Sequence, residues 1–322
     1  MNFKEELIAR CAARRRAQIG PMSDAAFEEL VLSVRANPAA NVSTPTEQAY
    51  ALLGRAMDKF QASVDDDDLL DDDEYMAARA KRFESLRATC AKALELDGDC
   101  LDAQLMAKLA AESSFDELLE GLRSLEVASA GGDAKPFDEL GWANVEDRPR
   151  LRLRAAFART CADSARWKMA RDAAESLLAV STGDGDPLGA RYTAALAYAR
   201  LEDEEGLNRL DARFSQGNVW SNLARCILLY KLDRPAAARR ALRGYAQLSQ
   251  GAAYALLRPI YVEIYLPDRP AYAAGSFEEA LCAVHEAEVI IADTPDFISW
   301  CSGQDWFAAD ARAYADAHDL EW

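Results

Sequence analysis

The sequence predicts an all-α fold, in the form of a right-handed α-α superhelix of stacked helical hairpins. Alanine and other helix-forming residues dominate its 322 positions. Apolar residues recur with helical periodicity almost from end to end, whereas runs of Val, Ile and Thr that indicate strands are few. In the second half of the chain, one spacing of large and small residues returns in consecutive helix pairs, which is typical of a solenoid.

Residues 1–130 are expected to form an irregular N-terminal helical half. Gly20 and Pro21 end its first helix, and Ser23 caps its second. An acidic segment, 65–74, connects the third helix to the fourth, and residues 131–147, rich in Gly, Asp and Pro, are expected to be a linker to the second half. The expected helices cover residues 2–19, 24–36, 47–63, 75–97, 100–111 and 115–128.

The clearest repeat signal lies in residues 219–248. Its apolar positions are Trp220, Leu223, Ala224 and Ile227, followed after a turn by Ala236. The first four share one helix face, and the small Ala236 is expected to let the second helix approach closely. This is the spacing of one tetratricopeptide helix pair, and such a pair cannot bury its apolar face alone. Stacked neighbours are therefore expected.

Two preceding helix pairs keep the same offsets, so residues 148–250 are expected to hold three tetratricopeptide-like pairs. Three pairs are about the minimum for a stable stack. The pairs are 149–164 with 166–180, 189–201 with 203–214, and 219–231 with 235–248.

Residues 251–322 are expected to be a C-terminal helical cap, stacked on the same array. Ile260 to Leu266 is apolar and β-branched, which favours an extended segment. Helices are expected over 276–292 and 304–319. Trp300, Trp306 and Trp322 suggest that these helices dock against the array.

The charge balance bears on the class of partner. The chain has 37 basic and 54 acidic residues, a net charge of −17. Such a balance repels phosphate backbones, so no nucleic-acid partner is expected. No apolar run reaches the roughly 18–20 residues that span a bilayer, and residues 1–16 lack an apolar signal core. No membrane partner and a cytoplasmic location are expected.

Few residues in the chain suit catalysis. There are two histidines, and His285 follows Cys282 by three residues on one helix. The two side chains could form a thiolate–imidazole pair or half a metal site, or only a helical surface contact, and no second pair completes four ligands. The acidic segment lacks the glycine and alternating ligands of a calcium loop. The sequence therefore predicts no enzyme, with no catalytic residue, cofactor or metal.

The repeat register selects candidate binding residues. In tetratricopeptide grooves the concave positions lie two before, one after and five after the motif tryptophan position. Several polar side chains fall there, and the arginines among them would hold a carboxylate-bearing peptide through bidentate hydrogen bonds. The alternative is that these arginines pair with Glu146, Asp147 or Glu175 and hold the stack together. The candidate peptide-binding residues are Arg152, Arg159, Thr193, Asn218, Ser221 and Arg225.

A family resemblance supports an interaction module. Its marks are Arg148-Pro149, Leu151-Arg152, Asp186, Gly189-Ala190-Arg191-Tyr192, Ser276-Phe277-Glu278-Glu279-Ala280 and Thr294-Pro295 before Phe297 and Trp300. With these the chain resembles, over about residues 75–300, bacterial tetratricopeptide-like proteins related to the suppressor of tumorigenicity seven family. The resemblance implies a helical-repeat protein without an established enzymatic activity, and it supplies no catalytic residues.

The function expected from the sequence is a non-enzymatic scaffold or adaptor that binds a protein or peptide in a helical-repeat groove. A regulatory sensor that binds a small ligand or signalling peptide is the alternative. An enclosed pocket in place of an open groove would favour the sensor. An enzyme centred on Cys282 and His285 would require a depressed thiol pKa in a cleft.

Overall fold

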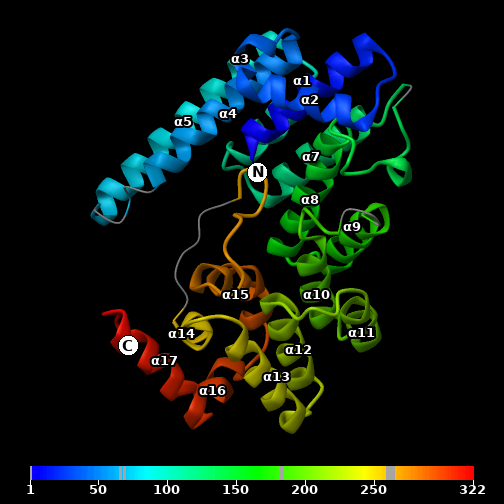
Figure 1. Ribbon diagram of the computed structural model, residues 1–322. Coiled ribbons are helices and arrows are strands. Elements are labelled where there is room, and N and C mark those ends of the chain that lie inside the picture. Colours follow the sequence, from blue (N-terminus) through cyan, green and yellow to red (C-terminus); the bar gives the residue numbers. More distant parts are fainter. Residues whose placement is uncertain (1, 65–66, 68–69, 133, 182–184, 259–264) are drawn as a thin grey trace. The chain divides into compact units, whose positions relative to one another are not determined.

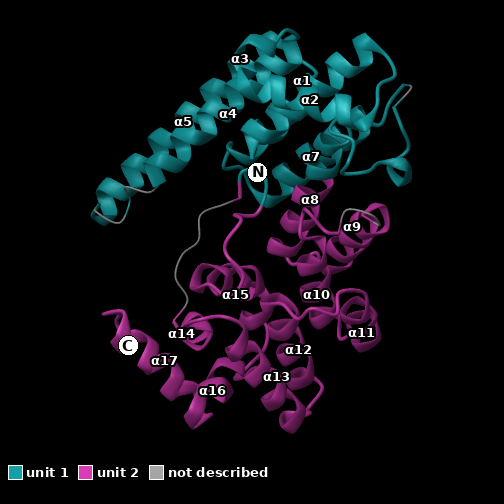
Figure 2. Ribbon diagram, in the orientation of Figure 1, with its two compact units in different colours: residues 1–153, 266–268 teal, residues 154–265, 269–322 magenta. Residues whose placement is uncertain are grey.

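The computed structural model describes the chain except for residues 1, 65–66, 68–69, 133, 182–184 and 259–264. The fold is all-α: the described residues form seventeen α-helices and a short 3-10 helix and contain no strand (Figure 1). None of the described helices is both long enough and apolar enough to cross a bilayer. The chain divides into two compact units, residues 1–153 with 266–268, and residues 154–265 with 269–322 (Figure 2).

The division falls within α8, after Leu153. Residues 131–147, expected to be a linker, belong to unit 1. The elements of unit 1 are α1 (Phe3–Ile19), α2 (Asp24–Ala36), α3 (Pro38–Asn41), α4 (Pro45–Val64), α5 (Asp72–Leu96), α6 (Leu101–Leu109), α7 (Phe115–Ser129), η2 (Phe137–Glu139) and the start of α8 (Arg148–Asp163).

Local capping sets where the first helices of unit 1 begin. The Asn2 side chain accepts a hydrogen bond from the Glu5 amide, and the Ser23 hydroxyl accepts one from the Ala26 amide. Each cap satisfies one of the amides that a helix start leaves without a partner. Gly20, with φ of 100°, ends α1 in a conformation that favours glycine.

The acidic segment contributes to α5 at the residues that the structure describes. Asp71 and Glu74 form a reciprocal capping box, which starts the helix at Asp72. Asp67 receives two hydrogen bonds from the guanidinium of Arg82, at 2.6 and 2.7 Å. Asp65, Asp66, Asp68 and Leu69 of the acidic segment lie outside the described residues.

Two apolar clusters hold unit 1 together. The larger joins α1, α4, α5 and α6 through residues such as Phe3, Leu53 and Phe83. α1 and α4 pack so closely that a Cβ added at Gly54 would lie 3.0 Å from the Cβ of Phe3. The smaller cluster joins α1 to α2 through Ile8, Cys11, Ala12 and Val34. Burial of α2 against one face of α1 leaves a neighbouring α1 face available for the groove described below.

Unit 2 contains the expected helix pairs and a set of C-terminal helices. In α10 and α12, nearly every small or aliphatic residue is buried, and α10 packs against both α9 and α12. Its elements are the rest of α8, α9 (Trp167–Val180), α10 (Ala190–Leu201), α11 (Glu204–Arg213), α12 (Val219–Lys231), α13 (Pro235–Leu248), α14 (Ala252–Leu257), α15 (Phe277–Ala292), α16 (Phe297–Ser302) and α17 (Asp305–Ala317).

The motif positions of two consecutive pairs meet in unit 2. The rings of Tyr192 and Trp220 stack with centroids 4.1 Å apart. Ala236, expected to be the small contact residue, is exposed, and Ala238 is fully buried instead. The reason is geometric: α13 begins at Pro235, so Ala236 lies in its first turn on the solvent side, two positions before the buried face.

Trp300 and α15, from the C-terminal part of the chain, contact α10 and α12. The Trp300 ring lies 5.1 Å from that of Tyr230 on α12, and α15 packs against α10 and α12. The short helices α3, α14 and α16 were not predicted, because four to six residues are too few to show a helical period. The extended segment expected at 260–266 lies mostly outside the described residues.

Candidate functional site

The sequence-predicted Arg152 lies in the core of unit 1. Its side chain is fully buried and donates to both carboxylate oxygens of Glu6, at 2.6 and 2.9 Å, and to Asp102, at 2.8 and 3.0 Å. Arg10 contacts the same two carboxylates. Burial acts to raise the pKa of Glu6, but the guanidiniums of Arg152 and Arg10 outweigh it and lower that pKa to about 2. Arg152 is therefore a core ion-pair residue and is not exposed to a peptide.

Two more of the predicted residues contact Tyr265 and Arg269, which like them belong to unit 2. Arg269 donates to the Thr193 hydroxyl at 2.8 Å and to the carboxylate of Glu286 at 2.6 and 2.7 Å. The guanidinium of Arg159 lies over the ring of Tyr265, whose hydroxyl donates to Glu286. Thr193 and Arg159 are both buried. Thr193 and Arg159 are thus both in contact with side chains of the chain itself.

The remaining three predicted residues also have partners within unit 2. Asn218 caps α12: its side chain accepts from the Ser221 amide at 2.9 Å and donates to the Ser221 hydroxyl at 3.0 Å. Arg225 forms a half-buried ion pair with Asp211, at 2.7 Å. Of these three, only Arg225 links two helices, α12 to α11, and its partner is Asp211 and not Glu146, Asp147 or Glu175.

The Cys282 and His285 pair does not have the features of an activated thiol. Burial raises the pKa of the Cys282 thiol to about 12, and Cys282 is buried. His285 faces Glu288, with 3.9 Å between its Nδ1 and the carboxylate. Within the described part of the chain, no group of three or more His, Cys, Asp or Glu side chains is arranged to hold a metal ion.

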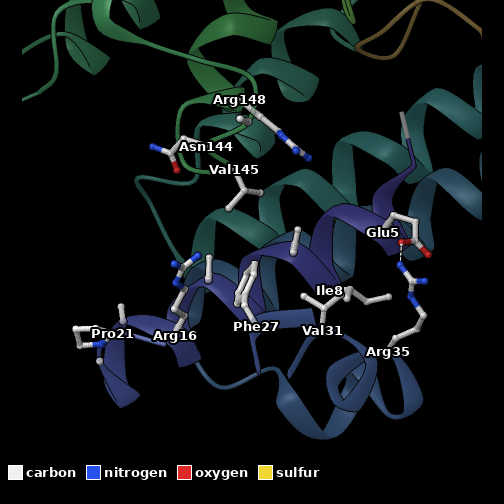
Figure 3. A pocket seen from close by; sticks show the side chains of 15 residues that line it. Glu5, Ile8, Arg16, Pro21, Phe27, Val31, Arg35, Asn144, Val145 and Arg148 are labelled. Atoms are coloured by element: carbon white, nitrogen blue, oxygen red, sulfur yellow. Dashed lines mark hydrogen bonds and ion pairs between the residues drawn. The ribbon is translucent and has the colours of Figure 1, made fainter. Parts of the chain in front are cut away.

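An open groove of about 620 Å³ lies in unit 1, between α1, α2 and the segment 143–148 (Figure 3). We call it the α1–α2 groove. From Glu5 to Gly20 it follows α1 for about 22 Å, taking about 1.5 Å per helical residue. Its lining residues are Glu5, Ile8, Ala9, Ala13, Arg16, Ala17, Gly20, Pro21, Phe27, Val31, Arg35, Ala143, Asn144, Val145 and Arg148.

The floor of the α1–α2 groove is apolar because of two helical periods. Ala9, Ala13 and Ala17 recur every four residues and make a strip of small side chains along α1. Phe27 and Val31, also four residues apart, form the α2 wall. In Figure 3 these α2 side chains stand beside Ile8, and Val145 reaches toward α1 from the 143–148 segment.

Asp147 holds the third side of the groove in place. This buried carboxylate accepts hydrogen bonds from the Gly141 amide at 2.9 Å, from Lys135 Nζ at 3.0 Å and from Asn144 Nδ2 at 3.0 Å. A carboxylate with three donors fixes the turn that presents Val145 and Arg148. The last residues of the segment expected to be a linker therefore form one side of the groove.

The groove is basic, although the chain as a whole is acidic. Its lining has three arginines and one carboxylate, in a protein of net charge −17. Arg16 is exposed and lies over the Phe27 ring, 4.7 Å from its centroid, and no carboxylate of the described residues pairs with it. The Arg35–Glu5 pair is half exposed, at 50% and 47%, so water screens it and a ligand carboxylate can replace Glu5.

Three contacts within unit 1 position the guanidinium of Arg148 at the groove. The Nε of Arg148 donates to the Trp142 carbonyl at 2.8 Å, its guanidinium lies 4.9 Å from the Trp142 ring, and its Nη1 is 3.5 Å from Glu6. The lining contains no serine, cysteine, histidine or lysine, and its one carboxylate, Glu5, forms an ion pair with Arg35. The groove is suited to recognising an acidic group attached to apolar side chains.

Sequence reasoning did not find this groove, since it followed the repeat register of the second half. One signal was available: the four-residue spacing of the alanines in α1, matched by Phe27, Val31 and Arg35 in α2. Arg148 could not have been assigned, because Asp147 and Trp142 position it through contacts specific to the fold. Comparison of the chain with family models, with curated proteins and with solved structures found no match.

Proposed function

We propose that this protein is a non-enzymatic binding protein that holds an acidic, partly apolar peptide segment of a partner protein in the α1–α2 groove. The observation that supports this most is the presence of Arg16, Arg35 and Arg148 around an apolar floor. Guanidiniums recognise carboxylates through paired, charge-assisted hydrogen bonds. A floor about 22 Å long fits several residues of a peptide and exceeds the length of a single amino acid.

The proposal includes a scaffold role for residues 148–250. We infer a right-handed, tetratricopeptide-like superhelix there, supported by the Tyr192–Trp220 stacking and by the buried small residues of α10 and α12. The resemblance to proteins related to the suppressor of tumorigenicity seven family agrees with such a role. A cytoplasmic location remains a prediction from the sequence.

A peptide-binding measurement tests the proposal directly. The probe is a fluorescein-labelled twelve-residue peptide that alternates Glu or Asp with Leu and Phe, and the control probe carries Lys in place of every acid. Arg16→Glu places a carboxylate at the groove in an exposed position, so the fold is expected to survive. Lys4→Glu is the matched control, since Lys4 is an exposed cation on the same helix and does not line the groove.

Fluorescence anisotropy with the full chain is expected to show binding of the acidic peptide and a Kd at least about tenfold weaker for Arg16→Glu, equivalent to about 1.4 kcal/mol. The Lys4→Glu protein should bind within about twofold of the natural chain. Equal binding of the acidic and basic peptides, or equal weakening by both substitutions, would contradict a groove that recognises carboxylates.

A further inference from the structure

A second cavity, of about 450 Å³, lies between α4 and α5 in unit 1. We call it the α4–α5 cavity. Its volume falls in the range of small-molecule sites, about 300–1,000 Å³. Its lining residues are Leu52, Arg55, Ala56, Lys59, Phe60, Ser63, Ala78, Lys81, Arg82, Ser85, Leu86 and Thr89.

The lining carries four cations and no carboxylate. Arg55, Lys59 and Lys81 are exposed, and none of them pairs with an acidic side chain in the part of the chain that the structure describes. The nearby acids Asp58 and Glu84 are exposed and do not line the cavity. Unpaired positive charge is thus concentrated in one cavity of an acidic protein.

The fourth cation, Arg82, is a built part of the cavity wall. It is only 6% exposed, its Nη atoms bind Asp67, and Nη1 also donates to the Ser63 carbonyl at 3.2 Å. Its Nε–H is buried and has no acceptor among the described residues. A buried donor without an acceptor costs about 1–3 kcal/mol, which a bound anion would offset.

Two contacts join α4 to α5 beside the cationic residues of the cavity. The Ser63–Arg82 hydrogen bond and the edge-to-face contact of Phe60 with Phe83, 5.5 Å between centroids, join α4 to α5. Lys59 and Lys81 lie within one helical turn of these contacts. The two lysines, Arg82, Ser63 and Ser85 therefore lie close together in the lining of the cavity.

The rest of the wall is apolar and comes from Leu52, Ala56, Phe60 and Leu86. A ligand that fits both the cationic and the apolar part of the lining has a highly charged group attached to an apolar body. A phosphomonoester carries about −1.5 to −2 charges near neutral pH and three acceptor oxygens, which suits several cations better than a carboxylate with one charge. An elongated polyanion such as nucleic acid is disfavoured by the net charge of the chain.

We propose that the α4–α5 cavity binds a small organic phosphate, with the phosphate at Lys59, Lys81 and Arg82 and the apolar body against Leu52, Ala56 and Leu86. This site is separate from the α1–α2 groove in its residues, so its test is independent of peptide binding. It gives a specific form to the sensor alternative, since occupancy would join α4 to α5 through the ligand.

Isothermal titration calorimetry of the full chain tests this site with hexyl phosphate, inorganic phosphate and 1-hexanol. The double substitution Lys59→Gln with Lys81→Gln removes two exposed charges, and Lys92→Gln is the control on the same helix as Lys81 but outside the cavity. Thermal unfolding by circular dichroism checks that each variant is folded. Co-sedimentation with phosphatidic acid vesicles examines whether a lipid headgroup in a membrane is the source of the phosphate.

Hexyl phosphate is expected to bind more tightly than inorganic phosphate, and 1-hexanol is expected not to bind. The double variant should weaken hexyl phosphate binding at least tenfold, while Lys92→Gln changes it less than twofold. Vesicle binding that depends on Lys59 and Lys81, without binding of free hexyl phosphate, would replace the small molecule with a membrane and overturn the proposal. Absence of hexyl phosphate binding at 0.15 M salt, or equal weakening by Lys92→Gln, would also overturn it.

Discussion

The buried carboxylate of Glu6 offers a sharp test of how unit 1 is stabilised. Glu6→Gln keeps the size of the side chain but removes its charge from between Arg152 and Arg10. The pKa of Glu6 is lowered from its ordinary 4.5 to about 2, with the two guanidiniums outweighing burial. Each pKa unit is worth about 1.36 kcal/mol, so the ionised carboxylate contributes on the order of 3 kcal/mol to folding at neutral pH.

The pH dependence of this contribution has a definite sign. Because the folded-state pKa lies below the unfolded value, the contribution is present above about pH 4.5 and is lost as the pH falls toward 2. On the order of 1 kcal/mol of it is gone at pH 3.5, since the unfolded chain then binds a proton that the folded chain does not. The stability difference between the natural chain and Glu6→Gln should therefore shrink as the pH falls.

Native-state hydrogen exchange, read by mass spectrometry on peptides from α1 and α6, measures this difference within unit 1. The control is Glu5→Gln on the same helix, whose pair with Arg35 is half exposed and is expected to contribute less than about 1 kcal/mol. If Glu6→Gln costs no more than Glu5→Gln at pH 7, or if its cost does not change between pH 7 and 3.5, then the buried ion pairs do not stabilise unit 1 as reasoned.

Two further predictions concern the groove and the thiols. Asp147→Ala leaves three hydrogen-bond donors without their carboxylate. Amide hydrogen exchange of residues 141–147 should therefore become faster by the equivalent of about 1–3 kcal/mol, while exchange in α4 is unchanged. Equal exchange in both proteins would show that Asp147 does not fix this turn. Burial raises the pKa of the Cys282 thiol to about 12, so Cys282 should resist iodoacetamide at pH 7.5 in the folded chain and react after unfolding in urea. Mass spectrometry measures the labelling. Rapid labelling of the folded chain would support the hypothesis of an enzyme centred on Cys282.

Much of the secondary structure could be predicted from local signals. Ser23 starts α2, Pro235 starts α13, and the Ser276 cap starts α15, because each acts on backbone groups only a few residues away. The helix pairs in 148–250 were likewise predicted by their spacing. The exchange of Ala236 for Ala238 as the buried small residue shows the limit, since the expected helix start at Pro235 was right and yet the packing of α13 decides which of its faces is buried.

The sequence by itself determined that the chain is helical, where most helices begin and end, and that its net charge is strongly acidic. Those properties depend on short-range periodicity, capping and composition. Only the tertiary structure decided which arginines are available. Arg152 meets carboxylates 146 and 50 residues away and is buried, whereas Arg16 lies beside a groove. Pairing between residues distant in sequence depends on how helices pack, and no local pattern encodes it.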